Sequence, residues 1–148
     1  MIKFKTLTVK NFMSVGNVTQ AINFEGQDLT LVLGQNIDLG GDDAGSRNGT
    51  GKTTILNALS FALFGDALTN IKRDNLVNKT NERGMVVSCE FEIDGKNYKI
   101  ERGRKPAIIK FYVDGKQDED DEAQGDSRET QKDITKLLGM SHIMFQNI

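Results

Sequence analysis

The sequence has a single cysteine and no long hydrophobic run, and these two features exclude an internal disulfide and a membrane-spanning helix. One cysteine among 148 residues cannot form an internal disulfide. The longest nearly apolar run, residues 58–64, is far shorter than the roughly 20 residues that a membrane span needs. Residues 1–4 alternate in polarity and do not open a signal peptide. We therefore expect a cytoplasmic protein with no membrane partner.

The remaining composition is that of an ordinary globular chain. Hydrophobic residues make up 37% and charged residues 27%, which predicts one compact domain over residues 1–148. Cys89 lies on the apolar side of an alternating run, residues 87–93. The prediction for this thiol is therefore that it is buried and unreactive.

The net charge of −2 conceals a separation of charge along the chain. Residues 96–116 contain seven basic and two acidic side chains, whereas residues 117–126 contain six acidic and no basic ones. A basic sheet edge can hold the phosphate backbone of DNA, although a charge run is usually only a solvated face. The candidate DNA contacts are Lys96, Lys99, Arg102, Arg104 and Lys105.

Alternation and turn residues predict most of the strands. Residues 2–12 and 21–24 read as strands, and the apolar run 28–33, which ends at Gly34, reads as a central strand buried on both faces. Three more strands are expected between residues 84 and 116, where Asp94-Gly95 and Asp114-Gly115 mark tight turns. These strands predict an antiparallel β subdomain, followed by an acidic loop over residues 117–126.

Two helices are expected. Apolar residues recur at helical spacing from position 51 to position 64, and Gly65 is placed to end that helix. A second helix is predicted over residues 127–138, ended by Gly139. The polar segment 66–81 reads as connecting structure with a possible helical turn over residues 71–77.

A glycine-rich loop between the buried strand and the first helix indicates a phosphate site. The P-loop pattern requires glycines, then Lys and Ser or Thr, after a strand and at the start of a helix. Backbone amides of such a loop surround a phosphate, and the N-terminus of the helix adds a positive dipole end. The residues that carry this prediction are Asn48, Gly49, Thr50, Gly51, Lys52, Thr53 and Thr54.

The same chemistry assigns roles within the loop. Lys52 is expected to place its ammonium on the β- and γ-phosphates of ATP, and Thr53 to coordinate Mg²⁺ through its hydroxyl. Thr54 is expected to bond a neighbouring phosphate oxygen. The predicted cofactors are therefore ATP and Mg²⁺.

The first half of the motif is interrupted. The pattern requires glycine six residues before Lys52, where the sequence has Ser46. A better opening is Gly34-Gln35-Asn36, which implies an insertion of 12 residues (46 − 34 = 12). Because the inserted residues 37–47 are polar and glycine-rich, we expect a flap beside the nucleotide.

Six segments follow one another in a recognisable order, namely residues 7–14, 31–36, 48–59, 61–65, 100–103 and 138–141. This ordered set resembles the SMC-like DNA repair ATPases of the SbcC type, and most closely the large ATPase subunit of tailed-phage recombination endonucleases. The six segments cover nearly the whole chain in the order that the family has them.

The resemblance implies an α/β fold, the N-terminal lobe of an ABC-type P-loop ATPase head with a mixed sheet. It implies ATP hydrolysis that drives DNA end processing in double-strand-break repair, in the host cytoplasm if the protein is phage-encoded. The implied partners are a second ATPase head joined through ATP, a nuclease subunit, and DNA.

Several parts of such a head are not found in this sequence. The family also has a coiled coil with a zinc hook, a signature motif and a Walker B Asp-Glu on its C-terminal lobe, and these are absent here. Gln146 and His142 fall too early for the glutamine and histidine of the family. We therefore expect a fragment that lacks the coiled coil and the C-terminal lobe, and that binds ATP better than it hydrolyses it.

Two alternatives from other functional classes stay open at this point. A small P-loop kinase would act on a metabolite, but such kinases start close to their P-loop, whereas about 50 residues precede Lys52 here. A non-catalytic, nucleotide-gated DNA-binding module would use the basic face over residues 96–105.

Overall fold

The computed structural model describes residues 2–24, 52–117 and 127–146. Its elements follow in the order β1 (Ile2–Lys10), β2 (Gln20–Asn23), α3 (Lys52–Phe64), the 3-10 turn η2 (Arg73–Leu76), β3 (Met85–Ile93), β4 (Lys96–Arg104), β5 (Ile108–Val113), β6 (Lys116–Gln117), α5 (Ser127–Leu138) and α6 (His142–Gln146).

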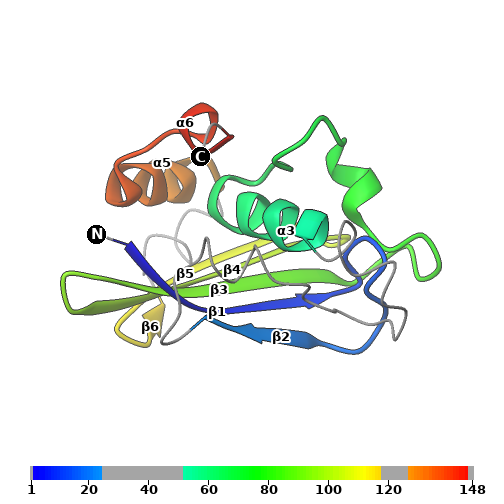
Figure 1. Cartoon of the computed structure of the whole chain (residues 1–148), viewed down its shortest axis with the longest axis horizontal. Coiled ribbons are helices and arrows are strands. Elements are labelled where there is room, and N and C mark those ends of the chain that lie inside the picture. Colours follow the sequence, from blue (N-terminus) through cyan, green and yellow to red (C-terminus); the bar gives the residue numbers. More distant parts are fainter. Residues whose placement is uncertain (1, 25–51, 118–126, 147–148) are drawn as a thin grey trace.

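One six-stranded sheet forms the base of the molecule, with strand order β2-β1-β3-β4-β5-β6 (Figure 1). Every pairing among these described strands is antiparallel. The pairing of β1 with β3 joins segments about 80 residues apart, since Thr8 lies opposite Ser88. This contact brings the first strand of the chain into the middle of the sheet.

The turns within the two hairpins have the backbone conformation that their residues favour. Asp94 and Gly95 have φ values of 49° and 84°, and Asp114 and Gly115 have values of 50° and 85°. Two consecutive left-handed residues are the requirement of a type I′ turn, which matches the twist of the flanking strands. Both turns predicted from Asp-Gly pairs are therefore confirmed.

The helices lie together on one side of the sheet (Figure 1). The sheet face beneath them carries apolar side chains at alternate positions, including Leu7, Val87, Cys89 and Ile100, which are all 0% exposed. The register places Leu7, Cys89 and Ile100 opposite one another across three strands. The core therefore lies between this face of the sheet and the helices, with α3 contributing most of its helical residues.

The strands between residues 84 and 116 are present, but they do not make a sheet of their own. They continue the sheet that β1 and β2 begin, because β3 pairs with β1 on one side and with β4 on the other. The sequence could not indicate this, since alternation defines a strand and not its partner.

Two elements were not predicted. Strand β6 has only two residues, and α6 has five, so neither is long enough to show a periodicity. The hydroxyl of Ser141 accepts a hydrogen bond from the Met144 amide at 3.3 Å, which caps α6.

Several predictions fall outside the described residues. These are the central strand over residues 28–33, the loop residues Asn48 to Gly51, the flap over residues 37–47 and most of the acidic loop over residues 117–126. Among the described helices, none is long and apolar enough to cross a membrane.

Candidate nucleotide-binding site

The candidate site is the N-terminus of α3, which begins at Lys52. The first amides of a helix have no partner within the helix and carry the positive end of its dipole. The first turn contains no acidic residue, so nothing in it opposes a bound anion. Thr53 is exposed there, whereas Thr54 is 1% exposed.

Helix α3 is surrounded by protein on nearly all sides. Ile55, Ala58, Leu59 and Ala62 are each 0% exposed, and the next residue, Leu63, is 1% exposed. A helix that is apolar all round belongs in a core. The N-terminus of α3 therefore belongs to a helix that is buried in the core and not to a surface helix.

Asn57 ties α3 to the segment that follows it. This side chain is 0% exposed, and its Oδ1 accepts hydrogen bonds from the amides of Leu68 at 2.9 Å and Thr69 at 3.2 Å. Its Nδ2 donates to the carbonyl oxygen of Thr53 at 3.0 Å. One buried amide thus connects the first turn of α3 with residues 66–69. The sequence analysis did not single out Asn57.

The other end of α3 receives donors from two other elements. The Nε of Arg102, in β4, donates to the carbonyl oxygen of Ala62 at 3.2 Å. The Nε2 of Gln131, in α5, donates to the carbonyl oxygen of Leu63 at 2.9 Å. The last carbonyls of a helix lack partners within it, so these bonds complete the C-terminal end of α3.

Comparison with known proteins gives the family. Residues 6–148 match the family described as AAA domain. The chain belongs to this family. It is also 33% identical over 146 residues to exonuclease subunit 2 of Enterobacteria phage T4, which spans 99% of this chain and 23% of that protein. It is 30% identical over 145 residues to the DNA double-strand break repair Rad50 ATPase of Methanococcus maripaludis, with 97% and 12% covered.

The fold of this AAA domain is that of an SMC head. A crystal structure of the Smc head domain from Pyrococcus furiosus, with an extended coiled coil and bound to the C-terminal domain of ScpA, matches with a TM-score of 0.55 at 18% identity. The match covers 96% of this chain and 34% of that one. The predicted resemblance and fold class, an α/β P-loop ATPase head, are thereby confirmed. The chain spans less than a quarter of the curated relatives described above.

The structure of this AAA domain separates the five basic residues that the sequence grouped. Side chains alternate between the faces of a strand, so Lys99 lies on the face of β4 opposite to that of Lys96, Arg102 and Arg104. Lys96 and Arg104 are at opposite ends of β4, and Lys105 follows the strand. The five residues therefore do not form one face.

Arg102 differs most from the other four basic residues, because its side chain is buried and only 8% exposed. Burial, together with the nearby charge of Arg73, lowers the pKa of its guanidinium to about 10. Among the described residues, its hydrogen-bond acceptors are Ala62 O and Gln131 Oε1, which are both uncharged. A buried side chain with these partners is not available to a DNA backbone, which corrects its place among the candidate DNA contacts.

The other four basic residues differ from one another in their contacts and exposure. Nε of Arg104 lies 2.6 Å from Oδ1 of Asp74, and this hydrogen bond lowers the pKa of the exposed Asp74 carboxyl. Nζ of Lys99 lies 5.7 Å from the centre of the Tyr112 ring. Lys96 and Lys105 are exposed.

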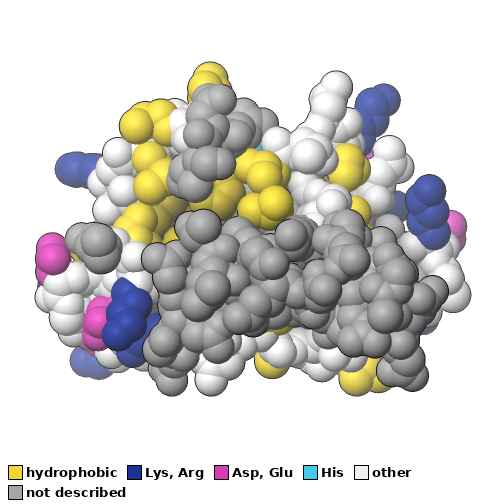
Figure 2. Space-filling view, viewed as in Figure 1, with side chains coloured by type: hydrophobic (Ala, Val, Ile, Leu, Met, Phe, Trp, Pro, Cys, Tyr) yellow, Lys and Arg dark blue, Asp and Glu magenta, His cyan; other side chains and the backbone are white. Residues whose placement is uncertain are grey.

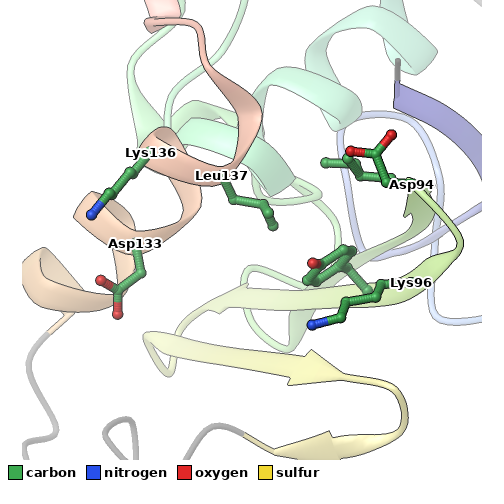
Figure 3. A pocket seen from close by; sticks show the side chains of 7 residues that line it. Asp94, Lys96, Asp133, Lys136 and Leu137 are labelled. Atoms are coloured by element: carbon green, nitrogen blue, oxygen red, sulfur yellow. The ribbon is translucent and has the colours of Figure 1, made fainter.

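A groove of about 630 Å³ lies between α5 and the β3–β4 hairpin. Figure 3 shows Leu137 pointing from α5 toward the hairpin. The charged side chains that line the groove balance in sign, with Asp94 and Asp133 against Lys96 and Lys136. A phosphate group would meet as many negative as positive charges here, so the groove does not compete with the N-terminus of α3 as a phosphate site.

His142, the single histidine, packs against α3. Its Nε2 lies 2.8 Å from the hydroxyl of Ser60, which donates to the carbonyl oxygen of Asp66 at 2.7 Å. Its ring also contacts that of Phe64, with centres 5.3 Å apart. This histidine joins α6 to α3 and is half-buried.

Proposed function

We propose that this chain binds ATP with Mg²⁺ at the N-terminus of α3. The observation that carries the proposal is the start of α3 at Lys52, where the glycine-rich sequence ends, on a helix held within the core. The amides of the first turn of such a helix, which have no partner within the helix, favour a phosphate group.

In this proposal, the roles follow the chemistry of each group. The amides of Asn48, Gly49, Thr50 and Gly51 surround the phosphates, and Lys52 neutralises the β- and γ-phosphates. The exposed hydroxyl of Thr53 fits Mg²⁺, which prefers oxygen ligands and would neutralise phosphate charge there. Thr54 bonds a phosphate oxygen.

We propose further that the whole protein hydrolyses ATP as the ATPase subunit of a nuclease complex that processes DNA ends in repair or recombination. Its relatives are named exonuclease subunit 2 and DNA double-strand break repair Rad50 ATPase. The proposal includes a nuclease subunit, a second head that shares the nucleotide, and a C-terminal lobe that supplies the remaining catalytic groups. The expected cytoplasmic location and the flap over residues 37–47 stay predictions.

Exposed apolar side chains support further protein packing on the helical layer. Figure 2 shows such side chains gathered over the helices on one face of the molecule. Ile143 and Met144, in α6, are 70% and 59% exposed. Apolar side chains gathered on a surface often mark an interface. We assign this surface to contact with the C-terminal lobe.

For DNA, we propose the end of the sheet where β4 finishes. Gly84 N donates to Lys105 O at 2.9 Å, which brings the exposed side chains of Arg83 and Lys105 into neighbouring segments. Arg104 is in the same place, although Asp74 neutralises it. At the other end of β4, Asp94 offsets Lys96. Among the described side chains at the two ends of β4, the positive excess that phosphates would meet lies at the first end. Lys99, on the opposite face, remains a weaker candidate.

The test is Mg²⁺-dependent ATP binding by the protein, by Lys52→Ala and by Thr53→Val. We expect the wild-type chain to bind and Lys52→Ala to lose binding, because the phosphates lose their positive partner. Thr53→Val should lose mainly the dependence on Mg²⁺. Hydrolysis should appear when the chain is mixed with a candidate C-terminal half that carries the signature and Walker B motifs.

Two results would contradict the proposal. If folded wild-type chain binds no ATP, the N-terminus of α3 is not a nucleotide site. If it binds ATP and transfers the phosphate to a small metabolite, the kinase alternative replaces the ATPase.

A further inference from the structure

Arg102 and Gln131 form a hydrogen-bonded pair at the C-terminal end of α3, opposite to the proposed nucleotide site. Nη2 of Arg102 donates to Oε1 of Gln131 at 2.5 Å. Through their other donors the two side chains bind the adjacent carbonyls of Ala62 and Leu63. A strand, the nucleotide helix and α5 therefore meet at one polar cluster.

The anchor of this cluster is rigid. Arg102 lies in β4, paired with Val87 of β3 on one side and Ile109 of β5 on the other. Its backbone is therefore held by strand pairing with a neighbouring strand on each side. Gln131 is fixed on its own helix, since its Nε2 also donates to the Thr135 hydroxyl at 3.0 Å.

The surroundings suit a buried cation whose hydrogen bonds, within the described part of the chain, go to uncharged acceptors, with the charge of Asp66 nearby. The last carbonyls of α3 carry the negative end of the helix dipole, which attracts a positive charge. Gly65 N completes the same helix end by donating to Phe61 O at 2.8 Å. A Cβ at Gly65 would lie 2.8 Å from Nη1 of Arg102, so glycine is what lets the guanidinium approach this closely.

Elsewhere on α3, the described hydrogen bonds of Asn57 and Ser60 join it to the segment that follows it and to α6, and not to the sheet. Most of its buried side chains are apolar, and apolar contacts do not fix the direction of a helix or its position along its axis. Hydrogen bonds do depend on direction and distance. The Arg102–Gln131 pair therefore ties the C-terminal end of α3 to the sheet and to α5 and, because a helix of 13 residues is a rod about 20 Å long, it helps to set where the first turn of α3 lies.

We propose that Arg102 and Gln131 are positioning residues for nucleotide binding, which act through α3 and without touching the nucleotide. This inference rests on the proposed ATP site. Groups that bind phosphate must be held in place within a fraction of an ångström, and a displacement of about 1 Å far from the ligand can cost as much as 100-fold. The pair also links the site to α5, so a shift of α5 alters the affinity for nucleotide.

The experiment measures the Kd for MgATP of folded protein at low temperature, with circular dichroism to establish folding. Arg102→Met and Gln131→Met should each raise the Kd roughly tenfold, because the C-terminal end of α3 loses its fixed position. The double variant should bind about as well as either single variant, since the two residues act as one unit. Arg102→Lys, which keeps one donor and the charge, should lie in between.

Arg104→Met is the matched control. It removes an arginine from the same strand and the same face, but this arginine pairs with the exposed Asp74 and not with α3. Its Kd should stay within about twofold of wild type. A purely structural role of Arg102 would lower the melting temperature and leave the Kd of the folded molecules unchanged.

The outcomes separate the two proposals. If wild type binds MgATP and folded Arg102→Met binds equally well, the positioning role is wrong while the ATP site stands. An equal loss in Arg104→Met would also overturn it, because the effect would then be one of charge. If Arg102→Met does not fold, Gln131→Met and Arg102→Lys decide by the same criterion. Failure of wild type to bind would remove the ATP site itself.

Discussion

At the scale of single residues, Asn57 shows how a buried polar side chain holds two segments together. Its Oδ1 is the acceptor of two backbone amides, those of Leu68 and Thr69, in a place that is 0% exposed. A buried amide without an acceptor loses its hydration and gains nothing. The backbone at Leu68 and Thr69 therefore depends on the Asn57 side chain.

Asn57→Ala should lower the free energy of unfolding by about 2 kcal/mol, because two amides lose their acceptor. Urea denaturation measures this loss. The matched control is Asn70→Ala, at an exposed position in the same segment, where we expect a change of no more than about 0.5 kcal/mol. Equal effects of the two substitutions would show that the Asn57 contacts contribute nothing.

Cys89 is the second residue whose surroundings decide its chemistry. Burial raises the pKa of this thiol well above its usual range, and the neighbouring charge of Glu90 raises it further. The neutral thiol of the folded state is a poor nucleophile. The prediction of a packed, unreactive cysteine agrees with its burial at 0% exposure.

In the folded protein, Cys89 should therefore react with a disulfide reagent at pH 8 only at the rate of unfolding, whereas the thiol in urea should react completely within minutes. The sign of the pH effect follows from the raised pKa. Thiolate forms in the unfolded chain first, so this residue reduces stability as the pH rises above about 8.5. Rapid labelling of native protein at pH 8 would contradict the assigned burial.

At the scale of elements, the ends of α3 and α5 offer a direct comparison. Gly65 and Gly139 each follow a helix with positive φ, 82° and 69°, and each donates its amide back to the helix. A Cβ at Gly139 would have no neighbour within 4 Å, whereas one at Gly65 would lie 2.8 Å from Arg102. The two positions share a left-handed backbone conformation, and they differ in this contact with Arg102.

Gly139→Ala should cost about 1 kcal/mol, the usual penalty of a left-handed conformation for a residue with a Cβ. Gly65→Ala should cost at least about 1 kcal/mol more, because the buried guanidinium must give up its hydrogen bonds to Ala62 and Gln131. Chemical denaturation of both variants compares the losses. Equal losses would mean that Arg102 moves aside freely.

The elements also show what local sequence can and cannot predict. Asp94-Gly95 and Asp114-Gly115 predicted their turns because a type I′ turn needs residues that accept positive φ, which is a local property. The end of α3 at Gly65 was predictable for the same reason. The burial of Arg102 was not, since every second residue of a basic strand looks alike until the helix that covers one face is known.

At the scale of the whole molecule, long-range pairing is what the sequence left undetermined. The strands after residue 84 were expected as a subdomain, yet β3 inserts between β1 and β4. Nothing local to residues 85–93 specifies a partner about 80 residues away. Helix α3, in contrast, was predictable as a unit, because a glycine loop before an apolar helix is a contiguous signal.

The same whole-molecule arrangement decides which cations can act together on DNA. Lys96 and Lys105 lie at opposite ends of β4, a strand of 9 residues that spans about 30 Å at 3.3 Å per residue. Lys105 has Arg83 in the neighbouring segment, whereas Lys96 has Asp94 beside it. Phosphates should therefore gather at the Lys105 end.

Retention of duplex DNA by the protein should fall steeply as salt rises, and Lys105→Gln should reduce the slope of log K against log salt by about one, as expected for the loss of one phosphate contact. Lys96→Gln is the matched control and should leave the slope unchanged, because its lysine lies at the end of β4 that has balanced charge. Fluorescence anisotropy measures both slopes at salt concentrations from about 50 to about 200 mM, a range over which phosphate contacts change the affinity strongly. If Lys96→Gln lowers the slope and Lys105→Gln does not, DNA lies at the hairpin end of β4 and the proposed surface is wrong.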